Sequence, residues 1–167
     1  TSVRVSPDKA WSSTVAGRIL QQRVDPTGIA LVEERAWDAE AGSVVRDFRN
    51  NGLLTTSGSK ATVWSLVSTT PAQATNVTFA AAISNAVMND ARLVALLADG
   101  TIWTAPSGQT TPTKVTLPPI TLLARAGSAI ALAEVQEAER KTVLRYYPTG
   151  DLTATSQQFT VDGAAAG

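Results

Sequence analysis

Short apolar runs alternate with turn residues along the whole chain. Residues 29–37, IALVEERAW, follow the turn residues Pro-Thr-Gly and pass from an apolar start into partial alternation with charge. The next run, SVVRDFRNNGLL (43–54), begins with β-branched residues and ends at Asn-Gly. This pattern is typical of strands joined by tight turns. We therefore predict that 29–37 is the second strand of a four-stranded unit and forms a hairpin with the run that follows it.

A helix from about residue 29 to 48 is the competing interpretation, because Ala, Glu and Arg are good helix formers. The pattern of 29–57 returns at 130–156, however, with a connecting loop two residues shorter. A hairpin tolerates such a change between its strands, whereas a continuous helix would lose its register. The repeat, together with Gly42 in the middle of the stretch, favours hairpins.

Further strands are expected along the rest of the chain. Asp99-Gly100, between LVALL and TIWTA, predicts a hairpin with a type I′ turn. Residues 79–91 are compatible with a helix or a strand, and the strand is favoured. Pro118-Pro119 marks a unit boundary, and single strands are predicted at 60–68, 114–124 and 153–161.

These patterns predict an all-β fold, an antiparallel meander of repeated three- to four-stranded units that is either propeller-like or a β-sandwich. A chain of 167 residues is long enough to bury a proper core. We expect a single domain over residues 1–161 with about three repeat units, at 3–68, 69–118 and 119–161. Residues 162–167 are expected to form a flexible tail.

Four phrases resemble the strand-turn-strand segments of β-propeller blades: VRVSPDK (3–9), RVDPTGIAL (23–31), ALLADGTIWTA (95–105) and RYYPTGDLT (145–153). A closed propeller needs at least four blades of about 40 residues. The resemblance therefore implies part of a larger propeller, an open meander or sandwich, or a subunit completed by partners. Exposed sheet edges are expected in each case, and exposed edges favour association with protein partners or a homo-oligomer.

Composition excludes several classes of function. Lys+Arg and Asp+Glu both number 14, so the chain lacks the basic surface of a nucleic-acid-binding protein. No apolar run reaches the roughly 18 residues of a membrane span, so membrane insertion is not expected. The chain has no Cys and no His. This excludes thiolate nucleophiles, Ser-His-Asp triads and ordinary zinc sites, and we predict no cofactor.

Carboxylates are the remaining candidates for acid–base chemistry. They gather in the two repeated stretches, at Glu33, Glu34, Asp38 and Glu40 and at Glu134, Glu137 and Glu139. A glycosidase would pair two of them across a cleft, but solvated hairpin faces beside arginines are the favoured interpretation. Asn89, Asp90 and Asp99 lack the spacing of a calcium loop and are interpreted as turn residues, so no metal site is predicted.

Aromatic residues are the candidates for partner binding. Trp11, Trp37, Trp64 and Trp103 are spread along the units, as repeated packing anchors or as contact residues. Tyr146 and Tyr147 are adjacent in a predicted strand, so one points inward and the other outward. The predicted partner-binding residues are Trp37, Trp64, Trp103, Tyr146 and Tyr147.

The sequence thus predicts a non-enzymatic structural or interaction module that acts through protein–protein contacts in a larger assembly. A cell-surface or extracellular assembly and a phage or virion particle are both compatible with the composition, and this favours an extracellular or virion-associated location. The alternative is a fragment of a propeller enzyme, a lactonase or glycoside hydrolase that uses carboxylates.

Overall fold

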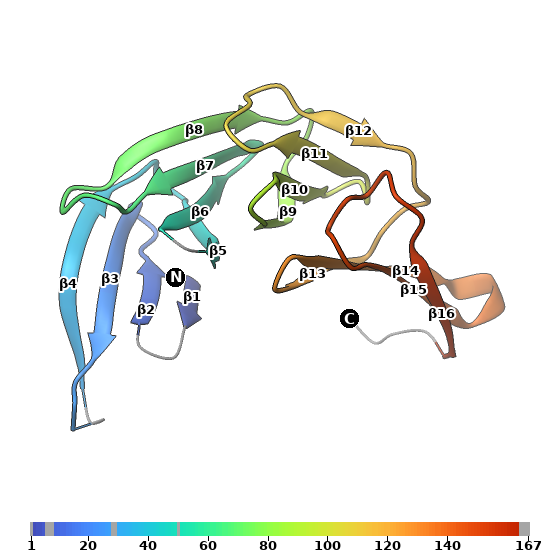
Figure 1. The fold of residues 1–167 in the computed structure, drawn as a ribbon, viewed down its shortest axis with the longest axis horizontal. Coiled ribbons are helices and arrows are strands. Elements are labelled where there is room, and N and C mark those ends of the chain that lie inside the picture. The colour runs from blue at the N-terminus through green and yellow to red at the C-terminus, as the bar shows by residue number, and fades with distance from the viewer. Residues whose placement is uncertain (1, 6–8, 28–29, 50, 164–167) are drawn as a thin grey trace. The chain divides into compact units, whose positions relative to one another are not determined.

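The structure is a computed structural model that describes residues 2–5, 9–27, 30–49 and 51–163. It consists of four antiparallel sheets of four strands each, and every sheet is a meander in which neighbouring strands follow one another in the chain (Figure 1). The predicted all-β meander of repeated units is therefore confirmed. The chain divides into two compact units, Thr1–Ala82 and Ile83–Gly167.

The first unit contains two sheets. The strands of its first sheet are β1 (Ser2–Val5), β2 (Lys9–Ser13), β3 (Arg18–Val24) and β4 (Leu31–Asp38). Those of its second sheet are β5 (Val44–Arg49), β6 (Gly52–Ser57), β7 (Lys60–Ser65) and β8 (Ala72–Thr78).

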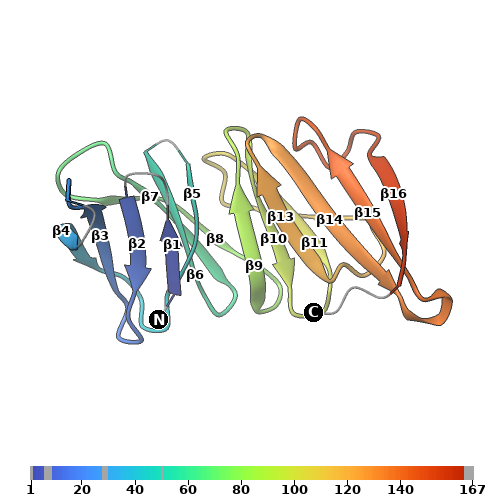
Figure 2. The same cartoon turned by 90° about the horizontal axis from the view of Figure 1, so that it is seen from below.

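The second unit repeats this arrangement (Figure 2). Its first sheet contains β9 (Ile83–Met88), β10 (Arg92–Leu97), β11 (Ile102–Pro106) and β12 (Thr113–Val115). Its second sheet contains β13 (Leu122–Ala126), β14 (Ala129–Gln136), β15 (Lys141–Tyr147) and β16 (Gln157–Asp162), with a 3-10 helix at Glu137–Glu139 between β14 and β15.

Each unit has a core between its two sheets. In the first unit this core is rich in aromatic rings: the centroids of Trp11 and Phe48 lie 4.9 Å apart, and Trp37 meets Trp64 edge to face at 6.0 Å. In the second unit the core is aliphatic. It brings Val94, Leu96 and Ile102 of one sheet against Ile130 and Leu132 of the next. On β10 and β14, for example, the alternate residues Val94 and Leu96, and Ile130 and Leu132, enter the core, as the period of a strand requires.

A backbone contact recurs at the turn between the second and third strands of the sheets. The carbonyl of Gly17 accepts a hydrogen bond from the N–H of Ala39 at 2.9 Å, and that of Gly100 accepts one from Ile120 at 2.8 Å. In both cases the donor belongs to the segment that follows the fourth strand. Gly17 has φ +90°, and a Cβ there would lie 2.5 Å from the carbonyl oxygen of Glu40. Glycine therefore allows this segment to lie directly against the turn.

The structure decides between the helical and strand interpretations. Residues 31–38 and 44–49 are the separate strands β4 and β5, so the helix over 29–48 is excluded, and β9 confirms a strand within 79–91. Asp99-Gly100 joins the paired strands β10 and β11, as predicted. Pro118-Pro119 lies between β12 and β13, which belong to different sheets, so the predicted boundary is also confirmed.

The position assigned to residues 29–37 is wrong. Residues 31–38 form β4, the fourth strand of its sheet, and β4 does not pair with the following strand β5, which begins the next sheet. The proposed repeat fails for the same reason, because Ala129–Gln136 is a second strand. Alternation of apolar and polar residues indicates that a segment is a strand. It does not indicate which position the strand has in a meander.

The repeat count and one turn type also need correction. The sheets span residues 2–38, 44–78, 83–115 and 122–162, so there are four repeats where about three were predicted. Gly100 has φ +80° but Asp99 does not have a positive φ, which excludes a type I′ turn. A type I turn followed by a glycine bulge explains the bonds from the Gly100 N–H to the Leu97 carbonyl and from the Leu97 N–H to the Thr101 carbonyl.

The tail is partly ordered. Asp162 pairs with Lys141 in the sheet, and residues 164–167 lie outside the described residues. Whether residues 1–161 form a single domain stays a prediction.

The two faces of β13–β16 should respond differently to truncation. Leu132 is fully buried between the sheets, so Leu132→Ala is expected to lower the free energy of unfolding by about 2–5 kcal/mol. Leu144, on the neighbouring strand, is 37% exposed, and Leu144→Ala should cost less than about 1 kcal/mol in the monomeric chain. Chemical denaturation at low protein concentration measures both values, and equal losses would contradict the assignment of the faces.

Candidate interaction surface

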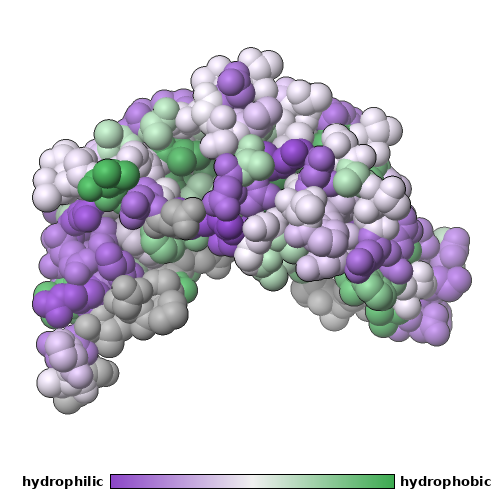
Figure 3. Space-filling model, in the orientation of Figure 1, coloured by the Kyte–Doolittle hydropathy of each residue, from purple (hydrophilic) through white to green (hydrophobic). Residues whose placement is uncertain are grey.

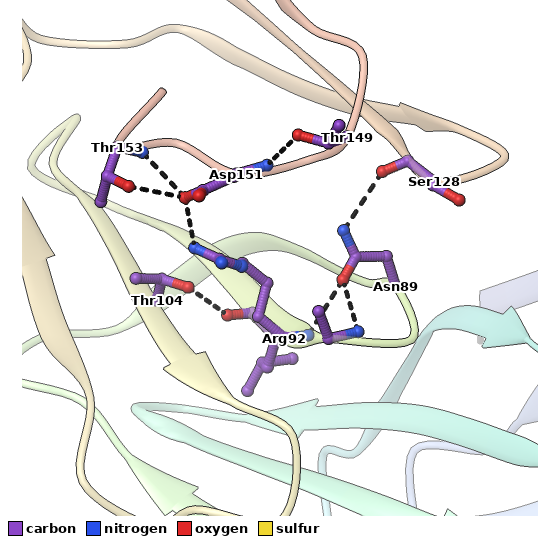
Figure 4. Close-up of polar contacts among 9 residues, drawn as sticks. Asn89, Arg92, Thr104, Ser128, Thr149, Asp151 and Thr153 are labelled. Atoms are coloured by element: carbon purple, nitrogen blue, oxygen red, sulfur yellow. Dashed lines mark hydrogen bonds and ion pairs between the residues drawn. The ribbon is translucent and has the colours of Figure 1, made fainter. Parts of the chain in front are cut away.

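A polar junction fixes the position of the last sheet on the one before it. The Asn89 side chain caps the turn between β9 and β10, where its Oδ1 accepts hydrogen bonds from the N–H groups of Ala91 and Arg92 at 3.0 and 2.9 Å. Its Nδ2 donates to the carbonyl of Ser128, in the β13–β14 turn, at 3.1 Å (Figure 4). The Asn89 side chain thus stabilises the β9–β10 turn and also connects it to the sheet β13–β16.

An ion pair completes this junction. Arg92 Nη1 lies 3.0 Å from Asp151 Oδ1, and Asp151 also accepts hydrogen bonds from the backbone N–H and the hydroxyl of Thr153 at 3.1 and 2.8 Å (Figure 4). The bonds from Thr153 and the charge of Arg92 hold the pKa of Asp151 below its ordinary value. The carboxylate therefore remains charged under mildly acidic conditions, and it ties the β15–β16 connection to β10.

The Asp-x-Thr turn around Asp151 occurs twice more. In both other copies the aspartate carboxylate accepts bonds from the backbone N–H and the hydroxyl of the threonine two residues later, and these bonds lower its pKa: Asp25 with Thr27, and Asp99 with Thr101. Such side-chain bonds stabilise a turn locally. These aspartates are therefore turn residues, as predicted for Asp99.

The charged residues of β13–β16 all lie on the face that packs against β9–β12, here called the inner face. Strand pairing places five of them there, namely Arg125, Glu134, Lys141, Arg145 and Asp162. Glu134 accepts a hydrogen bond from Gln136 at 2.9 Å and pairs with Arg145 at 2.8 Å, and these two contacts lower the pKa of its carboxyl. Glu134 and Arg145 thus compensate each other's charge beside the core.

The opposite face, called the outer face, is uncharged. Its residues follow from the register of the four strands: Leu122, Ala124, Ala126, Ala129, Ala131, Ala133, Val135, Thr142, Leu144, Tyr146, Gln157, Phe159 and Val161. No charged side chain belongs to this face between residues 122 and 162, a stretch that the structure describes without a gap. An antiparallel sheet with one face in water normally places polar residues there. In this sheet the charged side chains of the strands lie on the packed face instead, and the outer face has none.

Several large apolar side chains of the outer face reach the surface. Leu122 is 53% exposed, Phe159 55% and Val161 51%. Leu122, Ala133, Leu144 and Phe159 are directly opposite one another across the four strands, so they form one continuous row. Hydrophobic residues are visible at the surface in the region of β13–β16, at the lower right of Figure 3. A contiguous exposed apolar patch of this kind marks a contact surface.

The predicted contact residues are distributed between core and surface. Tyr147 is 3% exposed in the core of the second unit, whereas Tyr146 is half-buried on the outer face, so the two tyrosines point in opposite directions as expected. Trp64 is buried in the core of the first unit, with Trp37 packed partly buried against it. Trp103 on β11 is half-buried, and its indole N–H donates a hydrogen bond to the hydroxyl of Thr101 at 3.1 Å.

The placement of the tryptophans matches repeated packing anchors only in part. Trp11 and Trp37 belong to the same sheet, and β13–β16 contains none. Only Tyr146 of the predicted contact residues lies on the outer face. The partner-binding role of the others stays a prediction.

Besides Glu134, four of the candidate carboxylates form ion pairs with described residues. Glu34 lies 3.6 Å from Arg23 and 3.9 Å from Lys9, Glu40 lies 3.2 Å from Lys60, and Asp38 lies 3.9 Å from Arg18. Glu139 lies 3.4 Å from Lys141. Each of these carboxylates thus lies beside a cation, as the interpretation of solvated hairpin faces beside basic residues predicts.

The described part of the chain contains neither a candidate metal site nor a membrane-spanning helix. No group of three or more carboxylates is arranged to hold a metal ion among those residues. No helix in the same ranges is long and apolar enough to cross a membrane.

The outer face was not predicted from the sequence. Its signal is present in alternate positions of KTVLRYY and QQFTVD, where Thr, Leu and Tyr and then Gln, Phe and Val share one face. Strand pairing is needed to see that these sets adjoin each other and the alanines of β14. Periodicity within one strand does not reveal an apolar surface shared by four.

Gly150 gives a test of the junction. It has φ +71°, and a Cβ there would lie 2.1 Å from Asn89 Nδ2 and 2.4 Å from the Ser128 carbonyl oxygen. Gly150→Ala should lower the free energy of unfolding by about 2–5 kcal/mol, since strain of a positive φ adds to overpacking. Gly108→Ala is the matched control, because φ is +76° and nothing lies within 4 Å of the new Cβ. Its cost should be about 1–2 kcal/mol, and equal losses in chemical denaturation would contradict the tight contact.

The pKa of Asp151 predicts a pH dependence of stability. A carboxyl whose pKa is lower in the folded than in the unfolded chain stabilises the fold above the unfolded pKa of about 3.9. That contribution is lost as the pH falls through the lower folded pKa. In Asp151→Asn the free energy of unfolding should therefore fall less steeply between about pH 5 and 2 than in the parent chain. Urea denaturation at a series of pH values measures this, and parallel curves would show that Asp151 makes no such contribution.

Comparisons with known proteins show the fold alone. No family model matches the chain, and no curated protein matches it. Among solved structures, the computationally designed Ika8 protein covers 98% of this chain with a TM-score of 0.62 at 15% identity, and the designed Ika4 protein covers 98% with a TM-score of 0.61 at 13% identity. Hsv2 of Kluyveromyces lactis covers 98% with a TM-score of 0.68 at 14% identity.

The matched share of those proteins differs. The chain covers 91% of the Ika4 protein, but it spans only about half of the other two, 49% of Ika8 and 50% of Hsv2. At these identities the similarity extends to the repeated antiparallel sheets and not to a function.

Proposed function

We propose that this chain is a propeller-like interaction module that acts through protein–protein contacts in a larger assembly. The observation that carries the proposal is the uncharged outer face of β13–β16, on which Leu122, Phe159 and Val161 are each more than half exposed. Burial of apolar surface drives most protein association. A partner that covers this face removes these side chains from water without having to remove a charge.

The outer edge of the sheet adds a second means of contact. β16 is the last strand of its sheet, and all of its residues from Gln157 to Asp162 are exposed. Such an edge offers unpaired backbone groups to another chain. Phe159 and Val161 belong to both features, since they lie on this edge strand and point to the outer face. The assembly thus gains both apolar and backbone contacts at one place.

The alternative of a propeller enzyme receives no support from a specific observation. Its candidate carboxylates Glu34 and Glu134 lie beside cations, and Glu134 has a lowered pKa. A general acid in a glycosidase requires a raised pKa. The cell-surface and virion settings are equally compatible with a contact module.

A charge on the outer face should prevent association without unfolding the chain. Phe159→Asp is expected to weaken self-association in sedimentation velocity at least about tenfold, because a carboxylate would have to lose water at the contact. The melting temperature of the dilute chain should change little, since Phe159 is 55% exposed.

Thr160→Asp is the matched control for this experiment. Thr160 is the next residue along the same exposed strand, but it points to the inner face. The control should associate like the parent chain. If the parent chain associates and Phe159→Asp associates just as strongly, the outer face is not the contact surface and the proposal is contradicted.

A further inference from the structure

We propose that the outer face of β13–β16 binds the outer face of β1–β4 of a second copy of this chain, in a head-to-tail contact. The inference rests on the proposed function and names its partner. By the outer face of β1–β4 we mean the face turned away from β5–β8. Neither face is used by the sheet-to-sheet packing within the two units.

Packing within the units has a direction. In the first unit, β1–β4 uses the face that contains Trp11 and Ile19 to contact the sheet that follows it. In the second unit, β9–β12 uses the face that contains Val94 and Ile102. The two faces are equivalent, because Ile19 and Ile102 each lie two residues after an equivalent turn glycine, Gly17 or Gly100. A sheet thus presents the same face to its successor in both units.

The outer face of β13–β16 is the face that would meet a succeeding sheet. Its inner face already contacts the preceding sheet through Ile130 and Leu132. Its outer face has Ala133, Val135 and Leu144 around the β14–β15 turn, where β9–β12 has Val94, Leu96 and Thr104 around the β10–β11 turn. The outer face of β13–β16 therefore suits a partner face of the kind with which a sheet contacts the sheet before it in the chain.

The first sheet of the chain, β1–β4, offers a face of this kind, because its other face packs against the sheet that follows it. Pairing places Val3, Val5, Ala10, Leu20 and Ala36 on it. Val3 is 54% exposed and Val5 is 74% exposed. Side chains that small and branched suit a partner face with alternating alanine and larger apolar groups, because opposed sheets pack by interdigitation. The charges of this face lie toward the ends of its strands, at Arg18, Glu33 and Asp38.

The longer similar structures give an independent indication of the occupant. The chain matches half of Ika8 and half of Hsv2 over 98% of its own length. Chains of the same fold thus extend for about as much again. A second copy supplies an equal amount of the same kind of sheet.

A head-to-tail contact also differs from a symmetric one in its surfaces. In a symmetric contact, the outer face of β13–β16 would meet the same face of a second copy. Both would be faces that normally contact a succeeding sheet, and neither unit contains a contact between two such faces. The proposed contact is heterologous: it uses two different patches on each copy. This difference can be tested by disabling one patch at a time.

Two variants each disable one patch. Phe159→Asp disables the outer face of β13–β16, and Val5→Asp disables that of β1–β4. Thr160→Asp and Val67→Asp are the controls, since Thr160 points inward on β16 and Val67, 77% exposed, follows β7 outside both faces. The association state is measured by native mass spectrometry and sedimentation velocity on the 167-residue chain, at up to about 100 µM.

We expect the parent chain and both controls to form dimers or higher multiples, and each face variant alone to be monomeric. An equimolar mixture of Phe159→Asp and Val5→Asp should form a 1:1 heterodimer and stop there, because one intact face of each kind remains. Isotope labelling of one variant identifies the heterodimer by mass.

Two outcomes would overturn the inference. If Val5→Asp alone still dimerises while Phe159→Asp does not, the contact is symmetric; the proposed function then stands and the head-to-tail partner fails. If the parent chain remains monomeric over this range, the second copy is not the occupant.

Discussion

Each unit depends on the burial of the apolar faces that its two sheets present to each other. A four-stranded meander that stood alone would expose its apolar face to water, so it needs a second sheet to pack against. In the second unit Leu132 and Ile130 are fully buried against Val94 and Ile102, and in the first Ile19 and Leu53 are fully buried between their sheets. Each sheet thus contributes to stability chiefly through its neighbours.

Charge distribution makes the last sheet unusual. Its charged residues lie on the inner face, where Glu134 and Arg145 pair with each other, and its outer face has none. A partly buried ion pair contributes little net stability after desolvation, but it penalises any register in which one partner lacks the other. The Arg92–Asp151 pair and the Asn89 cap act in the same way at the end of the sheet. Polar contacts therefore fix how the sheets stack, and apolar contacts provide the free energy.

Much of the fold was accessible from the sequence, and the reasons for the failures are specific. Short apolar runs between Gly, Pro and Asn residues identified strands, and Asp99-Gly100 and Pro118-Pro119 were placed correctly as a hairpin and a boundary. Residues 29–37 were predicted to be a second strand paired with the following run, although β4 is a fourth strand that does not pair with β5. The error arises because second and fourth strands show the same alternation of apolar and polar residues. The outer face was missed because it exists only once the register of Leu122, Ala133, Leu144 and Phe159 is known. Of the predicted contact residues, Tyr146 alone lies on it, since aromatic residues serve cores and surfaces equally well.

The composition of the outer face has a consequence for the kind of assembly that it can form. Its β14 strand contributes alanines, with Ala133 almost fully buried by its neighbours, while the larger Leu122 and Leu144 stand on the strands at either side. Such a surface is shallow between raised margins, so it favours a partner with aliphatic residues that fill the middle. A flat polar partner would leave the alanines uncovered and would desolvate its own polar groups without compensation. The face of a sheet from the same fold meets this requirement, because the core of the second unit already joins the aliphatic faces of two such sheets.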